Sequence, residues 1–210
     1  MLKSIADFYE QRVFAHMLER SLDTPEMRRL RRKVLAPARG HVLDVGVGSG
    51  MSLYAYPPTV TRITGLDRLP ANDLLQQRAA ALDIPFEYIQ SSAEEIPCED
   101  NTFDTVSCQL VLCTVPDIKK SLREIHRVLR KDGVLLFMEH VLAEKAWIRA
   151  GQHLLTPLQR VVSCGCRLNR DTAAYIEEAG FHIEKPERQI FPGYRFAGEI
   201  LIHGCATPTS

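Results

Sequence analysis

The chain has 210 residues, of which 45% are hydrophobic and 25% charged, as is typical of a globular protein with a core of its own. Lys and Arg total 26, and Asp and Glu also total 26, so the formal net charge of zero gives no overall field that attracts nucleic acid. The first ten residues contain two acidic residues and no apolar stretch, which predicts that there is no secretory signal. No run approaches the roughly 18 apolar residues of a spanning helix. These features predict a cytoplasmic protein without stable membrane insertion.

Residues 1–40 are predicted to form helices. The tripeptide Asp23-Thr24-Pro25 is typical of a helix start, because proline fits the first turn of a helix. The helix that follows carries basic residues at positions 28, 29, 31, 32 and 33. We interpret these side chains as a solvated face rather than a phosphate-binding or membrane-surface patch.

From residue 41 onward, apolar strands alternate with helices, which indicates a parallel sheet covered on both faces. Strands are predicted at 41–46, 62–67, 86–90, 103–108 and 134–139, and helices near 70–82 and 117–130, with a turn at 132–133. The segment 141–168 breaks this rhythm. A helix near 170–179 follows, with Gly180 as its C-terminal cap, and strands near 181–190 and 195–204 end the pattern.

A glycine turn follows the first of these strands, in the segment HVLDVGVGSG at 41–50. Its glycines let the backbone approach a ligand closely, and Asp44 lies two residues before the first of them. The G-x-G-x-G spacing differs from the G-x-G-x-x-G of dinucleotide-binding proteins, and there is no P-loop motif. Asp67 ends the next strand, where an acid accepts hydrogen bonds from a ribose diol. The glycine turn and Asp67 together indicate a nucleoside-containing cofactor.

Five blocks in this order resemble the class I S-adenosylmethionine-dependent methyltransferases, from about residue 40 to the end. They are the turn at 41–50, Asp67, the loop 92–97 before 100–104, the segment 110–112, and the segment 123–133. The resemblance implies an α/β fold with a Rossmann-like, seven-stranded, mostly parallel sheet and helices on both faces. It also implies one domain over 1–210, with N-terminal helices (1–40), a cofactor-binding core (41–140), a lid (141–168) and a C-terminal helix and strands (169–210).

The same resemblance implies S-adenosylmethionine as cofactor and S-adenosylhomocysteine as product. Asp44 and the glycine backbone are expected at the methionine end, Asp67 at the ribose, and Ala93 and Glu94 at the adenine. The implied cofactor-binding residues are Tyr9, Asp44, Gly46, Val47, Gly48, Gly50, Asp67, Arg68, Ser92, Ala93, Glu94 and Gln109. Ser92 stands where many relatives have Asp, and its hydroxyl is a weaker acceptor for the adenine amino group. Tyr9 either reaches the cofactor or is a core residue of an amphipathic helix.

A finer resemblance, to the thiol S-methyltransferase branch of the methyltransferase-like proteins, covers the second half. It rests on the segments 56–58, 110–113, 138–141, Trp147, 165–166 and 168–172. It implies a small hydrophobic thiol as methyl acceptor. Animal members of this branch sit on membranes through an N-terminal hydrophobic helix, which we do not find here, so the membrane location is not carried over.

A thiol acceptor needs little catalytic machinery, because the methyl group is already activated and part of the thiol is ionised at neutral pH. His140 follows the fifth strand and is the candidate proton acceptor, with a core histidine as the alternative. Glu139 precedes it and faces the opposite way, so we expect one of the two in the pocket and favour His140. The expected substrate-pocket residues are Leu110, Cys113, Glu139 and Trp147. The segment around Trp147 is interpreted as an apolar lid, with a packed helix or a membrane-touching patch as alternatives.

Six cysteines lie at positions 98, 108, 113, 164, 166 and 205. The C-x-C pair at 164 and 166 has no second close pair to complete a zinc site, so no metal is predicted and free thiols are expected. Three interpretations remain open for Cys113, Cys164 and Cys166: structural thiols, ligands of a soft metal or metalloid, or residues carried in the branch.

Two other function classes fit the sequence less well. One is methyl transfer to a quinone-type ring carbon, a hydroxyl or a phospholipid amine. The other is a non-catalytic cofactor-binding protein, which the intact glycines and Asp67 disfavour. Nucleic-acid methylation is disfavoured because residues 108–111 read CQLV rather than the Asn/Asp-Pro-Pro-aromatic motif of base amino-methylases. The sequence does not indicate an oligomeric state.

Overall fold

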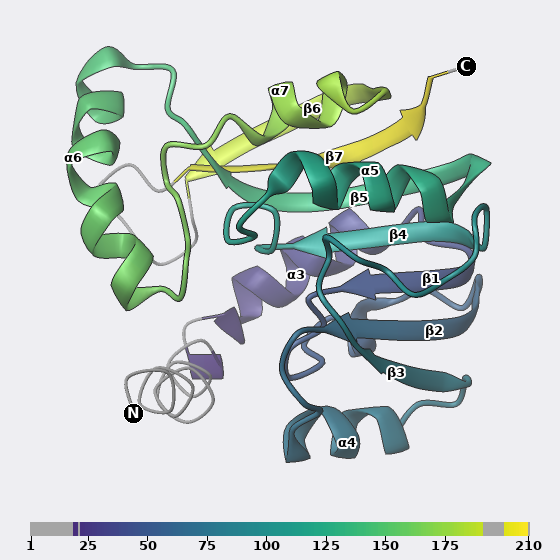
Figure 1. Ribbon diagram of the computed structural model, residues 1–210. Coiled ribbons are helices and arrows are strands. Elements are labelled where there is room, and N and C mark those ends of the chain that lie inside the picture. Colours follow the sequence, from purple (N-terminus) through teal and green to yellow (C-terminus); the bar gives the residue numbers. More distant parts are fainter. Residues whose placement is uncertain (1–18, 21, 191–199, 210) are drawn as a thin grey trace.

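The computed structural model describes residues 19–20, 22–190 and 200–209, which fold around one twisted sheet (Figure 1). Its strands are β1 (Gly40–Val45), β2 (Val60–Asp67), β3 (Phe86–Gln90), β4 (Phe103–Gln109), β5 (Leu129–Val141), β6 (Phe181–Ile190) and β7 (Ile200–Pro208). Its helices are α3 (Pro25–Leu35), α4 (Asp73–Ala80), α5 (Ile118–Val128), α6 (Ala146–Val162) and α7 (Thr172–Glu178), with a 3₁₀ turn η2 (Leu53–Ala55).

The seven strands have the order β3-β2-β1-β4-β5-β7-β6. The neighbouring pairs from β3 to β5 are parallel, and β7 is antiparallel to both β5 and β6. The chain progresses in one direction from β1 to β3 and in the other from β4 to β5. In such sheets, ligands bind beyond the carboxyl ends of the strands where the order reverses, here β1 and β4. The predicted seven-stranded, mostly parallel sheet is confirmed.

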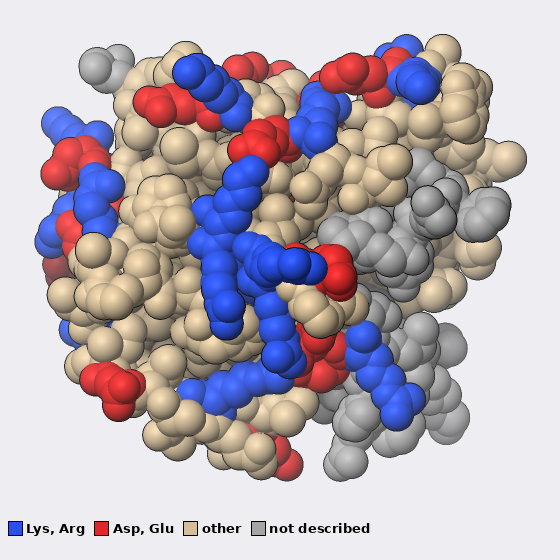
Figure 2. Space-filling model, turned by 180° about the vertical axis from the view of Figure 1, so that it is seen from behind, with Lys and Arg blue, Asp and Glu red and all other residues tan. Residues whose placement is uncertain are grey.

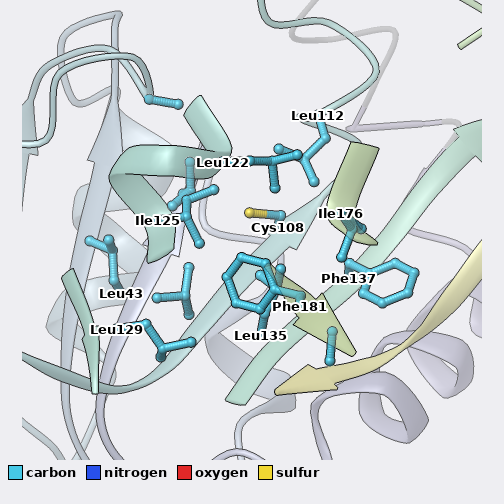
Figure 3. Packing of buried hydrophobic residues seen from close by; sticks show 14 of the residues in the cluster. Leu43, Cys108, Leu112, Leu122, Ile125, Leu129, Leu135, Phe137, Ile176 and Phe181 are labelled. Atoms are coloured by element: carbon cyan, nitrogen blue, oxygen red, sulfur yellow. The ribbon is translucent and has the colours of Figure 1, made fainter. Parts of the chain in front are cut away.

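Alternate residues of the central strands bury opposite faces of the sheet, as a period of two requires. On one face, Leu43 and Phe137 belong to the same buried cluster as Leu122 and Ile125 of α5, and Figure 3 shows the Cys108 thiol near Leu122. Cys108 is fully buried in this cluster, so it packs as a small apolar side chain.

The opposite face is covered by α3 and α4. Val42 and Leu136 belong to the same buried cluster as Leu35 of α3 and Leu75 of α4. Because both faces of the parallel strands are covered, helices lie in front of and behind the sheet (Figure 1).

Helix α3 begins as predicted, with the Thr24 hydroxyl accepting a hydrogen bond from the Met27 N–H at 3.2 Å. Four of its five basic side chains are exposed, but the expectation of a fully solvated basic face is wrong for Arg31, which is 3% exposed. Its Nη1 donates to the Tyr54 hydroxyl at 2.9 Å, which satisfies the guanidinium inside the fold. Figure 2 shows basic side chains running across the middle of one face of the molecule, with acidic side chains beside them.

Two predicted boundaries are corrected. The turn expected at Asp132-Gly133 does not interrupt the strand, because β5 starts at Leu129 and runs through it. Instead, the pairing of β5 with β4 shifts register here, because Leu129 pairs with Phe103 whereas Val134 pairs with Thr105. The last strand lies at Ile200–Pro208 rather than 195–204, and residues 195–199 lie outside the described part of the chain.

We expect Leu122→Ala on α5 to lower the free energy of unfolding by about 2–5 kcal/mol, because it leaves a cavity at a fully buried position. Lys120→Ala, an exposed position on the same helix, is the control and should change stability by less than about 0.5 kcal/mol. Urea unfolding followed by circular dichroism measures both. Equal losses in the two variants would contradict the packing of α5 against the sheet.

Candidate active site

A glycine turn closes the carboxyl end of β1. Gly46, Gly48 and Gly50 adopt φ values of 67°, 54° and 78°, a region that side chains disfavour. A Cβ atom on Gly46 would lie 2.2 Å from Cγ2 of Val111, in the loop after β4. The Gly46 N–H donates to the Leu66 carbonyl at 2.7 Å. The turn is therefore held closely between β2 and the loop after β4.

Asp44 lies in β1, just before this turn, and is 2% exposed. Its carboxylate accepts a hydrogen bond from the hydroxyl of Ser52, which follows the turn. Burial raises the pKa of Asp44 to about 6, against the opposing effect of the Ser52 hydrogen bond. Asp44 thus ties the strand to the far side of the turn.

Asp67 joins the end of β2 to the same turn. Its Oδ2 accepts from the Gly48 N–H at 3.1 Å, and its Oδ1 accepts from the Leu69 N–H at 3.0 Å. A carboxylate has about four acceptor positions, so two backbone donors leave acceptor capacity for a ligand. The next residue, Arg68, is exposed.

The loop after β3 contains the three residues expected at the adenine. Ala93 is buried at 6% exposure, whereas Ser92 and Glu94 are half-buried. Oε1 of Glu94 accepts from the Asp117 N–H at 3.2 Å, immediately before α5. Glu94 therefore also connects this loop to the start of α5.

The loop after β4 begins with Gln109, whose Nε2 donates to the Ser107 hydroxyl at 3.3 Å. Its Oε1 is buried and has no hydrogen-bond partner within the described residues. Leu110 adopts a positive φ of 60° and donates its N–H to the Met138 carbonyl at 2.7 Å. The chain therefore turns sharply where β4 ends, and Oε1 of Gln109 is a buried hydrogen-bond acceptor at the carboxyl edge of the sheet.

Glu139 holds this loop from β5. Its Oε1 accepts from the N–H groups of Val111 and Leu112, each at 2.9 Å, and its Oε2 accepts from that of Cys113 at 3.0 Å. The residue is fully buried, and burial raises the pKa of Glu139 to about 7 despite these three donors. Its carboxylate is thus directed at the backbone of the loop.

His140, the next residue, is half-buried and lies beside two thiols. Its Nδ1 is 3.8 Å from Sγ of Cys113 and 3.6 Å from Sγ of Cys166, and the two sulfurs are 3.8 Å apart. Hydrogen bonding between the thiols lowers the pKa of Cys166 to about 5, with His140 acting in the same direction. The structure thus gathers a group of three donors, which we call the thiol–imidazole cluster.

Trp147 lies on α6 and is 74% exposed. The residues that α6 turns inward are polar: Gln152 and Thr156 are the buried ones. The side chain of Gln152 accepts from the Ala143 N–H at 2.8 Å and donates to the Val141 carbonyl at 3.1 Å. The apolar side chains expected to form an inner lid wall, such as Trp147, are therefore on the outer surface of this helix.

The expected residues fall into two groups at the carboxyl edge of the sheet. Around the ends of β1, β2 and β4 lie Asp44, Gly46, Val47, Gly48, Gly50, Asp67 and Gln109. Around the loop after β4 and the end of β5 lie Leu110, Cys113, Glu139 and His140. Tyr9 lies outside the described residues. Sequence reasoning did not assign a role to Val111 or Arg170, and it left Cys166 as one of several thiols. The contacts of these three residues depend on which strands are neighbours in the sheet, and no short sequence motif indicates which strands are neighbours.

Arg170, which lies just before α7, also holds the loop after β4. It is 6% exposed, and its Nη1 donates to the Val115 carbonyl at 3.0 Å and also to the Leu112 carbonyl. Its guanidinium interacts electrostatically with both Cys113 and Cys166.

Among the described residues, no helix combines the length and the apolar character that crossing a membrane requires.

Comparisons with known proteins agree with this geometry. Residues 43–137 match the methyltransferase domain family. The chain is 35% identical to human thiol S-methyltransferase TMT1A over 156 residues, which are 69% of this chain and 64% of that protein. It is 36% identical to human thiol S-methyltransferase TMT1B over 165 residues, which are 75% of this chain and 67% of that protein. The chain thus spans about two thirds of the length of these relatives.

The fold also matches solved structures at low sequence identity. One is 1,6-didemethyltoxoflavin-N1-methyltransferase from Burkholderia thailandensis with bound S-adenosylhomocysteine. The TM-score is 0.69 at 18% identity, covering 99% of this chain and 90% of that one. The family match, the extent of the alignments and the sheet order together identify the protein: the chain belongs to the class I S-adenosylmethionine-dependent methyltransferases, with S-adenosylmethionine as its cofactor.

Proposed function

We propose that this protein transfers the methyl group of S-adenosylmethionine to the sulfur of a small hydrophobic thiol, releasing a thioether, S-adenosylhomocysteine and a proton. Similarity to two human thiol S-methyltransferases supports the choice of acceptor. The observation that carries it in the structure is the loop after β4. Val111 of this loop packs on the glycine turn, and its Cys113 lies beside His140. One loop therefore joins a cofactor side to an acceptor side.

On the cofactor side, we assign the methionine end to Asp44, Gly46, Val47, Gly48, Gly50 and Gln109. The unpartnered Oε1 of Gln109 fits this group, because a ligand ammonium supplies the donor that the described residues do not. Asp67 accepts from the ribose hydroxyls, and Arg68, Ser92, Ala93 and Glu94 flank the nucleoside. When bound, the cofactor supplies a methyl group that its positive sulfonium already activates.

On the acceptor side, the protein holds the thiol in line with the methyl group and promotes loss of its proton. An alkyl thiol has a pKa of about 8.5, so a modest shift toward the thiolate is sufficient near neutral pH. His140 is the group that we place at this step, because its half-buried imidazole lies at the carboxyl end of β5. The segment 141–168 contributes to this side through Cys166, which follows α6, rather than through the exposed Trp147.

The proposal extends to the setting of the reaction. We place the whole chain in one methyltransferase domain that acts on small molecules, and not on nucleic acid, because its formal net charge is zero. We place the protein in the cytoplasm, whose reducing conditions keep cysteines as thiols.

Asp67→Ala should weaken the binding of S-adenosylhomocysteine by about 10- to 100-fold, because hydrogen bonds to a charged acceptor contribute about 1.5–3 kcal/mol. Isothermal titration calorimetry measures the affinity. Asp83→Ala removes an equal charge from an exposed loop position and is the matched control. Unchanged affinity in Asp67→Ala would remove Asp67 from the cofactor site.

The acceptor is tested with radiolabelled S-adenosylmethionine and a panel of small alkyl and aryl thiols, each paired with the corresponding alcohol and amine. We expect methylation of the thiols only, because the site provides little acid–base machinery for an alcohol, whose pKa lies far higher. The Asp67→Ala variant gives the background rate.

Two results would contradict the thiol assignment. One is cofactor binding without turnover of any thiol in the panel. The other is preferred methylation of an alcohol, an amine or a quinone-type ring carbon. The first result leaves a methyltransferase fold whose acceptor has to be sought by fractionating cell extracts, and the second result identifies another acceptor class.

A further inference from the structure

The three donor atoms of the thiol–imidazole cluster come from three separate parts of the chain. Cys113 lies in the loop after β4, His140 near the end of β5, and Cys166 in the turn after α6. The two Sγ atoms and Nδ1 form a triangle with sides of 3.8, 3.8 and 3.6 Å, and Cys113 and Cys166 are buried. Within the described residues, this is the one group of three such donors that lies close enough to share an ion.

These distances are those of ligands around a tetrahedral zinc ion. With Zn–S of about 2.3 Å and Zn–N of about 2.0–2.1 Å, two sulfurs lie about 3.8 Å apart, and sulfur and nitrogen about 3.6 Å apart. A disulfide needs sulfurs about 2.05 Å apart, so the observed 3.8 Å between Cys113 and Cys166 is a pair of separate thiols. The triangle therefore fits a zinc ion above its plane with shifts of a few tenths of an ångström.

The backbone around each donor holds the triangle in place. The Arg167 N–H donates to the Cys113 carbonyl at 3.0 Å, which joins the turn after α6 to the loop after β4. A Cβ atom on Gly165 would lie 3.0 Å from the Thr114 carbonyl oxygen, so the two segments meet closely at a residue with a φ of 103°. The Cys113 N–H is bound by Glu139, the neighbour of His140. Ligands fixed in this way lose little freedom when a metal binds.

The charges also fit a divalent, thiophilic cation. Two thiolates neutralise Zn²⁺, and a neutral imidazole adds a third ligand without adding charge. A further thiolate at the fourth position brings one negative charge, and the buried guanidinium of Arg170 lies where it offsets that charge at Cys113 and Cys166.

We propose that Cys113, His140 and Cys166 bind one zinc ion through Sγ, Nδ1 and Sγ, and that its fourth position binds the acceptor thiol as a thiolate. This inference rests on the proposed function and specifies how the acceptor sulfur is ionised. His140 then acts as a metal ligand. Zinc sites with three protein ligands keep a position open for a water or a substrate, and zinc-bound thiols are deprotonated.

The chemical step balances without a change of oxidation state. The acceptor thiol gives its proton to solvent when its sulfur binds zinc. A lone pair on that sulfur then forms a bond to the methyl carbon, and the bond from this carbon to the sulfonium sulfur breaks. The released electron pair stays on that sulfur, which becomes the thioether of S-adenosylhomocysteine. The methylated acceptor is a neutral thioether, a weaker ligand than a thiolate, and it leaves the zinc.

Metal content of the full chain tests the first half of the inference. The protein is purified with zinc and a phosphine reductant, dialysed, and analysed by inductively coupled plasma mass spectrometry. We expect about one zinc ion per chain, and at least a tenfold lower content in Cys113→Ser and in Cys166→Ser. Cys98→Ser and Cys205→Ser, at two half-buried cysteines outside the cluster, are the controls and should keep the metal. Circular dichroism verifies that each variant is folded.

Cobalt substitution of the wild-type protein keeps the test independent of the variants. Co²⁺ in a site with two thiolates and one imidazole gives thiolate charge-transfer bands and the intense visible bands of tetrahedral coordination. Adding a small alkyl thiol, without cofactor, should change the visible bands as it enters the fourth position, and the matched alcohol should not.

Several results would overturn the inference. They are the absence of bound zinc and of cobalt bands in the reduced wild-type protein, retention of full zinc content in folded Cys113→Ser and Cys166→Ser, and cobalt bands that a thiol leaves unchanged.

The failure of the proposed function gives different results. If the metal-free enzyme methylates thiols at the full rate, the thiol acceptor stands and the zinc inference falls. If zinc and thiol bind as expected but no thiol is methylated, the metal site stands and the thiol acceptor falls.

Discussion

The carboxylate of Glu139 is the interaction on which the rest of the site depends. It accepts three backbone hydrogen bonds from successive residues of the loop after β4, from inside the sheet. Burying a carboxylate costs several kcal/mol, and hydrogen bonds to a charged group contribute about 1.5–3 kcal/mol each, so three of them offset part of that cost. Burial still has the larger effect, because it raises the pKa of Glu139 to about 7. Without this carboxylate, three successive N–H groups of the loop lose their partner, and two of these groups are buried.

That loop matters because it has two neighbours. Val111 fills the space that a side chain on Gly46 would occupy, so the position of the cofactor turn depends on the course of the loop. Two residues later, Cys113 lies beside His140, which follows Glu139 in the same strand. Arg170 fixes the other end of the loop through two backbone carbonyls. The proposed cofactor side and the proposed acceptor side are therefore joined by one short segment that is anchored twice.

Local pattern in the sequence predicts the apolar strands, the G-x-G-x-G turn and the acid that ends β2, and the family resemblance supplies the sheet. Contacts between distant residues lie beyond this reasoning. Arg31, in a run of basic residues, is predicted to be solvated, but its burial depends on Tyr54, 23 positions away. In the thiol–imidazole cluster, His140 is 27 and 26 positions from its two thiol partners. A search by short spacing finds only the C-x-C pair at 164 and 166 and predicts no metal. The cluster becomes visible only when β4 and β5 are known to be adjacent.

Asp44 and Glu139 each hold a loop from inside the sheet. Both are buried acids in the central strands, both have raised pKa values, and each directs its carboxylate at a loop beyond the carboxyl edge of the sheet. Placing acids of this kind on strands rather than on loops fixes their positions to the accuracy of the sheet itself. The proposed cofactor side depends on β1 and β2, whereas the proposed acceptor side depends on the segments that follow β4, β5 and α6, so one sheet can support methyl transfer to different acceptors through its loops.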